Sequence, residues 1–328
     1  MVKVSVLMPV YNAELYLAEA IESILSQNYE DWELIILNDG STDRSEEIVL
    51  SYQDDRIKYA KNTENRGLIY TRNKLIESAT GEYIAFLDSD DISYAERLST
   101  QVMFLDNNPD YGVCGTWAYM IDDEGKVIQK MNLPSDYEYI RCTLLFNNVF
   151  TQSSIMIRRQ ILLLHSYSDH FDLAEDYDLW CRLSSVCKVK NLPEHLTKYR
   201  WHETNISKSK KDRLEELVRI IYRRELGNIG IVPTERELSI HSAIRDKSVL
   251  DNTDFDSFLK ELREWLRKLC DAALDCGHYD RGYLKATIAF RWIFACKAHG
   301  RHLKALNIPI PLSLREYYLL LKILKERI

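Results

Sequence analysis

The sequence predicts an α/β fold with a mostly parallel central sheet, followed by an all-helical region. Three observations lead to this prediction. About the first ninety residues alternate short apolar runs with amphipathic helical patterns, the order expected of a parallel sheet with right-handed crossovers. Strand patterns end near residue 207, and only helical periodicity follows. The 328 residues, 46% hydrophobic and 28% charged, are enough for two ordinary globular domains.

Four strands and three helices are expected in order over this first segment. The strands are apolar runs at 2–10, 34–37, 57–60 and 83–87, which read as strands buried on both faces. A helix over 14–27 carries an apolar stripe at intervals of three and four residues. The next helix is expected to begin near Asp43, where Asp43 and Glu46 form a possible capping box. The third spans 68–78 and ends before Gly81.

The pattern changes after Asp91. A helix over 95–107 stops before Pro109, and a hairpin is expected to turn between Asp122 and Gly125. The remaining elements of this part are strands at 113–121, 127–131, 153–157 and 196–201, and a helix at 177–186. Five helices follow, at 211–226, 234–245, 254–276, 279–297 and 313–327. We therefore predict an α/β domain over 1–206 and a helical domain over 207–328.

Charge and cysteine content exclude some classes of protein. The chain has 43 basic and 50 acidic residues and a net charge of −7, whereas nucleic-acid-binding proteins normally have a basic surplus. Seven cysteines without a Cys-x-x-Cys pair indicate reduced thiols in a cytoplasmic protein. The chain starts directly with a strand, so no secretory signal is expected, and no apolar span is long enough for a bilayer. We expect a cytoplasmic protein that does not bind nucleic acid.

Polar side chains follow each of the four expected parallel strands. Asp88, Asp90 and Asp91 come directly after the fourth apolar run. Crowded carboxylates repel each other unless a cation neutralises them, and aspartates two positions apart can share one hard divalent ion. The carboxyl ends of parallel strands meet at one edge, where open α/β sheets bind ligands. The polar residues at this edge are Tyr11, Asn12, Asn38, Asp39, Asn65, Arg66, Gly67, Asp88, Ser89, Asp90 and Asp91.

These residues belong to longer motifs. The motifs are Val4-Ser-Val-Leu-Met-Pro-Val-Tyr-Asn12, Ile36-Leu-Asn-Asp-Gly-Ser-Thr-Asp43, Asn65-Arg-Gly67 with Thr71-Arg-Asn73, Gly81-Glu-Tyr-Ile-Ala-Phe-Leu-Asp-Ser-Asp-Asp91, Glu175-Asp-Tyr-Asp-Leu-Trp180 and Tyr199-Arg-Trp-His202. In this combination the sequence resembles the family 2 glycosyltransferases, which are inverting enzymes with the GT-A fold. The resemblance covers about residues 1–205 and leaves out the C-terminal helices. It implies a GT-A domain that transfers a sugar from a nucleotide-diphosphate donor, in a polysaccharide or glycan-assembly pathway.

The resemblance also implies which residues bind the donor. Pro9, Tyr11 and Asp39 would hold the base, and Asp90 would ligate Mn²⁺ or Mg²⁺, with His202 as a second metal ligand or a diphosphate contact. The other residues implied for the nucleotide site are Asn12, Arg72 near the diphosphate, Asp88 near the ribose or metal, and Ser89. The family usually has an acidic residue at position 38, where this chain has asparagine. The expected donor is a UDP-hexose or a UDP-N-acetylhexosamine.

Asp176 matches the position of the family's general base, which takes a proton from the acceptor hydroxyl. From the residues alone, Asp176 could instead only begin a helix, since acids favour helix N-termini. Asp178 or Glu175 could be the base if the local turn differs. Direct displacement would invert the anomeric centre, and a divalent ion would stabilise the departing nucleoside diphosphate. The expected acceptor is a saccharide or a lipid-linked glycan.

Two later segments have alternative interpretations. The polar stretch 203–211 could be a lid that brings Lys208, Lys210 and Lys211 near the phosphates, or simply a solvated run. The C-terminal helices combine apolar residues with cations, as helices on anionic membrane surfaces do. They could also form a packed subdomain or a homo-oligomer surface. The helical domain is therefore expected to make acceptor, membrane-surface or oligomer contacts, with peripheral association at the inner face of the cytoplasmic membrane as one outcome.

Two other functions are compatible with a sheet and a metal site. A nucleotidyltransferase acting on a sugar phosphate would normally carry a Gly-rich, basic loop after the first strand. This chain has Tyr11-Asn-Ala-Glu14 there instead. The other is a non-catalytic nucleotide-sugar-binding subunit, and the intact Asp39, Asp88, Asp90 and Asp176 argue against it. The transferase prediction is therefore preferred over both.

Overall fold

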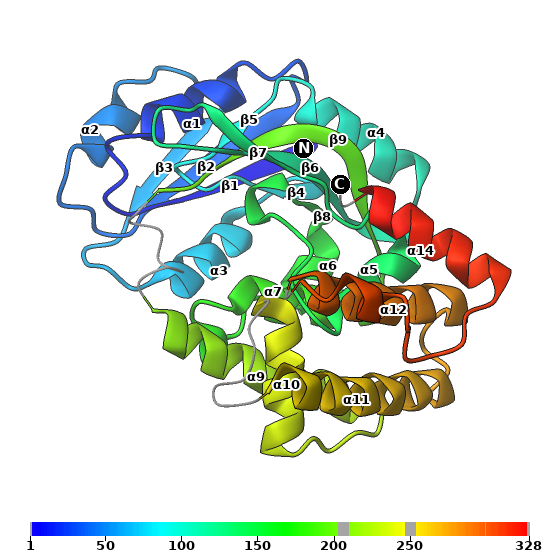
Figure 1. Ribbon diagram of the computed structural model, residues 1–328. Coiled ribbons are helices and arrows are strands. Elements are labelled where there is room, and N and C mark those ends of the chain that lie inside the picture. The colour runs from blue at the N-terminus through cyan, green and yellow to red at the C-terminus, as the bar shows by residue number, and fades with distance from the viewer. Residues whose placement is uncertain (1, 203–209, 247–253, 299, 327–328) are drawn as a thin grey trace. The chain divides into compact units, whose positions relative to one another are not determined.

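The computed structural model describes residues 2–202, 210–246, 254–298 and 300–326. The chain forms two compact units (Figure 1). The first unit comprises Met1–Ser135 and Phe150–Leu214, and the second comprises Asp136–Val149 and Glu215–Ile328. This division differs from the expected boundary at 206 mainly because residues 136–149 group with the C-terminal helices.

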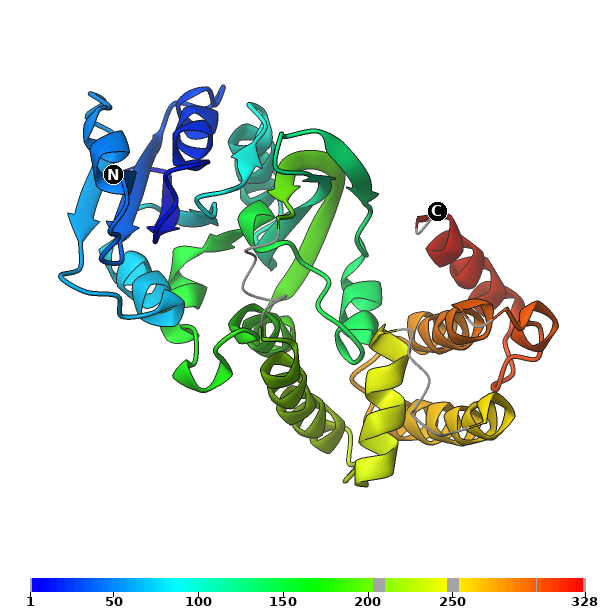
Figure 2. The same ribbon diagram turned by 60° about the vertical axis from the view of Figure 1, so that its left-hand side comes forward.

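Four neighbouring parallel strands form one half of the sheet in the first unit. Over the described residues the sheet has nine strands, in the order β3-β2-β1-β4-β8-β6-β9-β5, with β7 beside β6. β1 pairs in parallel with β2 and β4, and β2 pairs in parallel with β3, so their carboxyl ends lie at one edge, as predicted. Figure 2 shows β1, β2 and β3 in blue, with their arrows pointing the same way. These strands are β1 Val4–Val10, β2 Trp32–Asn38, β3 Ile57–Lys61 and β4 Tyr83–Phe86.

β9 is longer than its sequence pattern predicts. It spans Lys188–Arg200 and pairs in parallel with β6, whereas the prediction covered only 196–201. The pairing jumps between Leu192 and His195, which leaves Pro193 and Glu194 as a bulge. A bulge interrupts the two-residue alternation, and proline cannot donate a ladder hydrogen bond, so the first half of β9 has no strand signature. The other strands are β5 Ile92–Ser93, β6 Tyr111–Ile121, β7 Val127–Met131 and β8 Met156–Arg158.

Helices pack on the sheet of the first unit (Figure 1). In α1 the predicted apolar stripe, which includes Leu17, Ile21 and Ile24, is buried in one core cluster with side chains of β1 and β2. Burial of this stripe stabilises a helix that would be too short to form alone in water. The helices are α1 Leu17–Leu25, α2 Ser45–Leu50, α3 Leu68–Ser78, α4 Arg97–Asn107, α6 Arg159–Leu164 and α7 Glu175–Val186, with short 3₁₀ turns η1 Gln152–Ser154 and η2 Asp169–Phe171.

The predicted capping box at Asp43 is wrong. Arg44 occupies the N-cap position of α2, and its side chain makes no capping hydrogen bond. The carboxylate of Asp43 instead accepts hydrogen bonds from the amides of Glu14 and Ser45, at 2.9 and 3.0 Å. Glu46 forms an ion pair with Lys61 of β3 rather than folding back on the helix. The carboxylate of Asp43 therefore ties the loop after β1 to the first residue of α2.

The second unit contains helices and no strand among its described residues. Its core includes His241, whose ring stacks on Phe146 at 5.1 Å and meets the ring of Tyr222 edge-on at 4.5 Å. Within the described residues, no helix is long and apolar enough to cross a membrane. The helices are α5 Tyr137–Leu144, α9 Lys211–Asn228, α10 Glu235–Asp246, α11 Phe255–Asp275, α12 Arg281–Ala298, α13 His302–Ala305 and α14 Leu314–Glu326, and the first four residues of α9 belong to the first unit.

α5 was not predicted from the sequence. It is only eight residues long, so its pattern is too short to identify a helix. Packing stabilises it, because Tyr139 lies in one apolar cluster with Ala286 and Phe290 of α12. The backbone that follows α5 is also held within the second unit, since the hydroxyl of Tyr222 donates to the carbonyl of Phe146 at 2.7 Å.

Candidate functional site

Hydrogen bonds between two loops organise the carboxyl edge of the parallel strands. Asn12, after β1, has a φ of 48°, which is uncommon for a residue other than glycine. Its side-chain oxygen accepts a hydrogen bond from the amide of Thr42 at 2.9 Å, and its own amide donates to Ser41 Oγ at 3.0 Å. Beside this loop, Tyr11 is 49% exposed and Pro9 is buried in β1. Asn12 therefore shapes the loop that presents Tyr11 to solvent.

Asp39 is at the same edge and is almost completely buried, with 3% of its surface exposed. Its carboxylate accepts hydrogen bonds from Asn62 Nδ2 at 2.7 Å and from the amides of Arg66 and Gly67 at 2.9 and 2.8 Å. Asp39 thus holds the loop after β3, a role that the sequence analysis did not include. The neighbouring Asn38 is fully buried.

Arg72 of α3 connects two acidic segments that are far apart in the chain. Its Nη2 donates to Asp88 Oδ1 at 3.0 Å, and its Nη1 donates to Glu175 Oε1 at 2.6 Å. The guanidinium is buried, with 4% of the residue exposed. Burial by itself lowers the pKa of Arg72, but Asp88, Tyr167 and Glu175 more than offset this and raise the pKa above its ordinary value. The arginine is therefore a permanent positive charge between the end of β4 and the start of α7.

Asp90 faces His202, as the predicted metal site requires. Oδ2 of Asp90 lies 3.0 Å from Nε2 of His202, and their side chains are 30% and 13% exposed. The His202 ring also stacks on Tyr16, with the ring centroids 5.7 Å apart. One carboxylate and one imidazole are therefore held at the solvent-accessible end of the turn after β4.

The chemistry of this pair fits a divalent ion with other ligands from a substrate. Carboxylate oxygen and imidazole nitrogen both ligate Mn²⁺, and a protein commonly supplies one or two ligands when phosphates and water supply the rest. Among the described residues, no group of three or more His, Cys, Asp or Glu side chains is arranged to hold a metal. The donors therefore suit a metal bound together with a diphosphate and do not form an all-protein metal site.

Asp91 differs from Asp90 because it points into the protein. It is 1% exposed, and its Oδ1 accepts a hydrogen bond from the amide of Arg200 at 2.8 Å. The pKa of Asp91 is raised well above its usual range, first by burial and then by the nearby charges of Asp90 and Asp88. Asp91 therefore fixes the turn after β4 from inside and does not present a third ligand to solvent.

Arg200 at the end of β9 holds the same turn from the other side. Its Nε donates to the carbonyl of Asp90 at 2.9 Å, and its Nη1 donates to the carbonyls of Asp122 and Asp123 at 3.1 Å. Its Nη2 forms an ion pair with Glu19 of α1. Sequence reasoning noted the Tyr199–His202 motif but missed this role, which depends on three segments that meet only in the folded chain.

The acids at the start of α7 have three different environments. Glu175 is 6% exposed and is bound to Arg72, while Asp178 is fully buried and pairs with Arg182 at 2.9 Å. Asp176 is only partly buried, and its Oδ1 accepts a hydrogen bond from the amide of Tyr177 at 2.6 Å. Of the three carboxylates considered as a base, Asp176 is therefore the one that solvent or a substrate can reach most easily.

Tyr199 is a further residue of this site that sequence reasoning did not assign. The pKa of its hydroxyl is raised, first by burial and then by the charges of Asp91, Asp90, Asp88 and Asp176. A single phenol therefore lies within electrostatic reach of the acids after β4 and of the acid at the start of α7. Its position in β9, next to Arg200, gave no signal beyond the motif itself.

The structure describes Ser89 but only the end of the predicted lid at 203–211. Ser89 is partly buried in the turn between Asp88 and Asp90. The proposed lid at 203–211 falls mostly outside the described residues, which exclude 203–209 and therefore Lys208. Lys211 begins α9.

Comparison with known proteins identifies the family. The family model for Glycosyl transferase family 2 matches residues 5–165. The chain is 35% identical over 220 residues to the uncharacterized glycosyltransferase MJ1057 of Methanocaldococcus jannaschii, a match that covers 64% of this chain and 76% of that protein. It is also 35% identical over 213 residues to an Escherichia coli protein, the UDP-Glc:alpha-D-GlcNAc-diphosphoundecaprenol beta-1,3-glucosyltransferase WfgD, covering 63% of this chain and 80% of WfgD.

The fold agrees with this assignment. Residues 1–349 of TarS from S. aureus, in complex with UDP-GlcNAc, superpose with a TM-score of 0.58 at 19% sequence identity, covering 92% of this chain and 89% of that one. At this identity the likeness shows the fold alone, a GT-A-like mixed α/β sheet followed by helices. The matched family model and the curated relatives show that the chain belongs to glycosyl transferase family 2 and is a glycosyltransferase.

Proposed function

We propose that this enzyme is an inverting, metal-dependent transferase that uses a UDP-hexose or UDP-N-acetylhexosamine donor. The anomeric carbon forms a bond to an acceptor hydroxyl oxygen while its bond to the diphosphate oxygen breaks. The leaving UDP keeps the electrons of that bond, and the hydroxyl proton passes to the carboxylate of Asp176. Because the acceptor attacks opposite the leaving group, an α-linked donor gives a β-linked product.

The contact of Arg72 with both Asp88 and Glu175 carries this proposal. It ties the acids after β4, which serve the leaving group in our proposal, to the helix turn that contains Asp176. The raised pKa of Tyr199 supports the same arrangement, because its causes include carboxylates from both segments. A transferase needs its leaving-group contacts and its base around one reacting carbon, and this pair of segments provides both.

Asp90 and His202 are the residues that would hold the ion. When bound, a Mn²⁺ or Mg²⁺ ion supplies positive charge that stabilises the departing diphosphate. The pair lies 3.0 Å apart and is partly exposed, which suits an ion that shares its ligands with a substrate. Arg72 is buried behind Asp88 and keeps that carboxylate oriented.

Two residues of the chain and one relative support the choice of nucleobase and acceptor. Tyr11 is exposed at the end of β1 and provides a ring on which a uracil can stack. Asp39 already accepts three hydrogen bonds, and a carboxylate has about four lone-pair positions, so one remains for a ring N–H of the base. The name of WfgD states a UDP-glucose donor and a diphosphoundecaprenol-linked acceptor, and this supports a UDP donor and a lipid-linked acceptor here.

Replacement of Asp176 tests the proposed base. We expect Asp176→Asn to lower the turnover of UDP-glucose or UDP-GlcNAc with Mn²⁺ by about 10²-fold or more, because an amide cannot accept the proton. UDP affinity, measured by isothermal titration, should stay unchanged. Asp172→Asn is a matched control, since this exposed acid three residues before the first residue of α7 pairs only loosely with Arg213 at 3.5 Å.

Two results would contradict the proposal. Unchanged turnover in Asp176→Asn would show that another group takes the proton. Equal UDP affinity with Mn²⁺ and with a chelator, in the wild type and in Asp90→Ala, would refute the metal site. The anomeric configuration of the product, read from its proton coupling constant by NMR, decides between inversion and retention.

A further inference from the structure

The last long helix, α14, has an exposed apolar face in addition to its buried one. Leu314, Tyr317, Tyr318 and Leu321 recur at spacings of three and four residues, so they share one face of the helix. Their exposed fractions are 91%, 48%, 70% and 64%. We call these four side chains the outer face of α14. A regular exposed face of this kind marks a contact surface rather than scattered surface residues.

The opposite face of α14 is packed against other helices of the second unit. Leu319, Leu320 and Ile323 are 7%, 4% and 1% exposed and lie in one apolar cluster with Ala286 and Phe290 of α12. Burial of this inner face is sufficient to hold α14 in the second unit. The outer face is therefore available for a partner.

Two basic side chains lie beside the outer face. Lys325 is exposed and lies one helical turn beyond Leu321. The side chain of Arg315, next to Leu314, is 71% exposed, and its Nη2 lies 3.5 Å from a carboxylate oxygen of Asp280. The last 48 residues, from 281 to 328, contain ten lysine and arginine residues and two glutamates, although the whole chain has a net charge of −7. Some of these cations are buried or paired away from the outer face, so Arg315 and Lys325 are the ones that bear on it.

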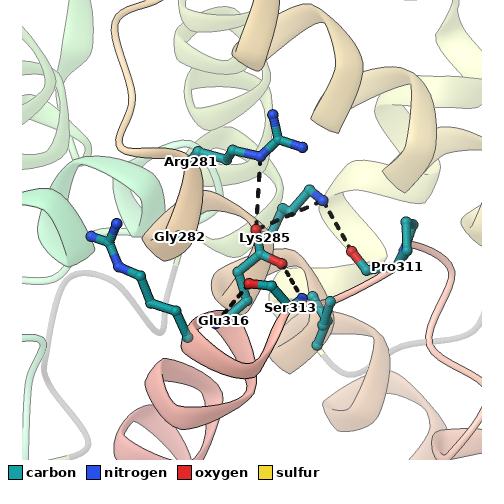
Figure 3. A pocket seen from close by; sticks show the side chains of 8 residues that line it. Arg281, Gly282, Lys285, Pro311, Ser313 and Glu316 are labelled. Atoms are coloured by element: carbon teal, nitrogen blue, oxygen red, sulfur yellow. Dashed lines mark hydrogen bonds and ion pairs between the residues drawn. The ribbon is translucent and has the colours of Figure 1, made fainter.

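A pocket of about 380 Å³ lies at the N-terminal end of α14 (Figure 3). Lys285 is buried there, with its Nζ 3.0 Å from the carbonyl of Pro311 and 3.7 Å from Glu316, whose carboxylate offsets its charge. Arg281 and Arg315 also line the pocket, and their side chains are 72% and 71% exposed. Arg281 lies 3.8 Å from Glu316 and Arg315 lies 3.5 Å from Asp280, so acids offset part of the positive charge at the pocket entrance.

We propose that the outer face of α14 docks on an anionic lipid surface. Leucine and tyrosine side chains enter the boundary between headgroups and acyl chains, where the amphipathic ring of tyrosine is favoured. Arg315 and Lys325 lie near the headgroup phosphates, and Arg281 adds charge at the pocket. This arrangement is an amphipathic helix lying in the plane of the surface, not a helix that spans it.

A second copy of the chain fits this face less well. A symmetric dimer places the same patch of both subunits in one contact, so two copies each of Arg315 and Lys325 would share it. Like charges at such a contact disfavour association, whereas anionic headgroups favour it by about fivefold in affinity for each cation near the surface. Charge complementarity therefore selects the lipid surface.

Flotation with lipid vesicles tests the proposal on the full chain. Wild type should bind vesicles of equimolar phosphatidylcholine and phosphatidylglycerol, and should bind pure phosphatidylcholine vesicles much more weakly. Tyr318→Ser with Leu321→Ser should lower the partition coefficient about tenfold or more. Arg315→Glu with Lys325→Glu should lower it to a similar extent, and added salt should weaken wild-type binding.

Matched variants keep the experiment specific. Leu50→Ser with Val232→Ser removes apolar groups that are 63% and 90% exposed elsewhere, and should leave vesicle binding unchanged. Lys260→Glu with Lys126→Glu makes the same charge change at exposed positions and should also have little effect. Circular dichroism confirms that each variant is folded.

Several outcomes would overturn the proposal. The proposal is wrong if wild type does not bind the anionic vesicles, or if the outer-face variants bind them as well as wild type does. A dimer in solution that Tyr318→Ser with Leu321→Ser dissociates, without vesicle binding, would assign the face to a second copy. The vesicle assay needs no sugar transfer, so the lipid proposal and the proposed transferase reaction can fail separately.

Discussion

Nε2 of His202 lies 3.0 Å from a carboxylate oxygen of Asp90, although 112 residues separate the two in the chain. The two-residue strand β5 explains this closeness. β5 begins right after Asp91 and pairs with β9 four and five residues before His202, with Ile92 opposite Lys198. Strand pairing therefore brings together the carboxylate and the imidazole that we propose as metal ligands.

Replacing this imidazole should remove metal-dependent nucleotide binding. His202→Phe keeps an aromatic ring against Tyr16 but removes the nitrogen that faces Asp90. We expect UDP affinity with Mn²⁺, measured by isothermal titration, to fall about tenfold or more, and affinity with a chelator to stay the same. Tyr16→Phe keeps both the stacking and the nitrogen and should bind as wild type does. Wild-type affinity in His202→Phe would exclude this histidine as a metal ligand.

Removing the charge of Arg72 should destabilise the first unit. Arg72→Met leaves Glu175 buried without its partner, which costs about 3–5 kcal/mol of unfolding free energy for a buried pair. Urea unfolding followed by tryptophan fluorescence measures this change. Arg44→Met is the control, because Arg44 and Glu47 form an exposed pair, 77% and 74% accessible, that should contribute little. Similar effects of the two substitutions would show that the buried contact has no special role.

Asp39→Asn should destabilise the protein even without a nucleotide. One carboxylate oxygen of Asp39 accepts a hydrogen bond from the backbone amide of Gly67. The other accepts from the side-chain amide of Asn62 and the backbone amide of Arg66. In asparagine an NH₂ group replaces one of these oxygens and would face a hydrogen-bond donor. We expect a loss of about 1–3 kcal/mol, because a buried hydrogen-bonding group is left unsatisfied. Thermal unfolding of the ligand-free protein detects it. An unchanged melting temperature together with weakened UDP binding would instead mean that Asp39 contributes only to binding the nucleobase.

The second unit should lose stability as the pH falls. The Nδ1 of His241 accepts from Trp265 Nε1 at 3.1 Å, so its Nε2 carries the hydrogen and donates to the carbonyl of Leu145 at 2.7 Å. The pKa of His241 is lowered from 6.5 to about 4, mainly by burial and also by the charges of Arg291 and Arg245, which together outweigh the raising effect of the hydrogen bond to Leu145. The folded state therefore binds fewer protons than the unfolded state between these two values.

Protonation of His241 destabilises the folded state. The contribution of neutral His241 is complete above pH 6.5 and is lost as the pH falls toward 4, with a loss of about 2 kcal/mol between pH 7.5 and pH 5. Urea unfolding at the two pH values measures it. His241→Phe should be less stable at pH 7.5 but should lack this part of the pH dependence. An equal pH dependence in both proteins would show that other groups cause it.

Much of the site could be predicted because it depends on local order in the chain. Parallel strands end at one edge, so the residues after four consecutive apolar runs had to lie near one another. Asp88 and Asp90 are brought to this edge in the structure, and Asp90 meets His202 as the resemblance implied. The identity of the family follows from the same short motifs.

The remaining features depend on contacts that no local pattern encodes. Arg200 meets three carbonyls and a glutamate from separate segments, and Asp39 accepts three hydrogen bonds from a loop more than twenty residues away. The bulge at Pro193 hides half of β9, because it interrupts the alternation on which strand prediction depends. Short elements such as α5 are stabilised by packing and not by their own sequence.

The position of α5 limits how this protein can be divided. A chain truncated at residue 206 keeps residues 136–149 but loses Tyr222 and His241, which bind the carbonyls of Phe146 and Leu145. Buried side chains such as Tyr139 would then be exposed to water and promote aggregation. A fragment that contains only the first unit's sequence up to residue 206 is therefore expected to express poorly. A separate catalytic fragment would require a redesigned 136–149 segment as well as a new C-terminus.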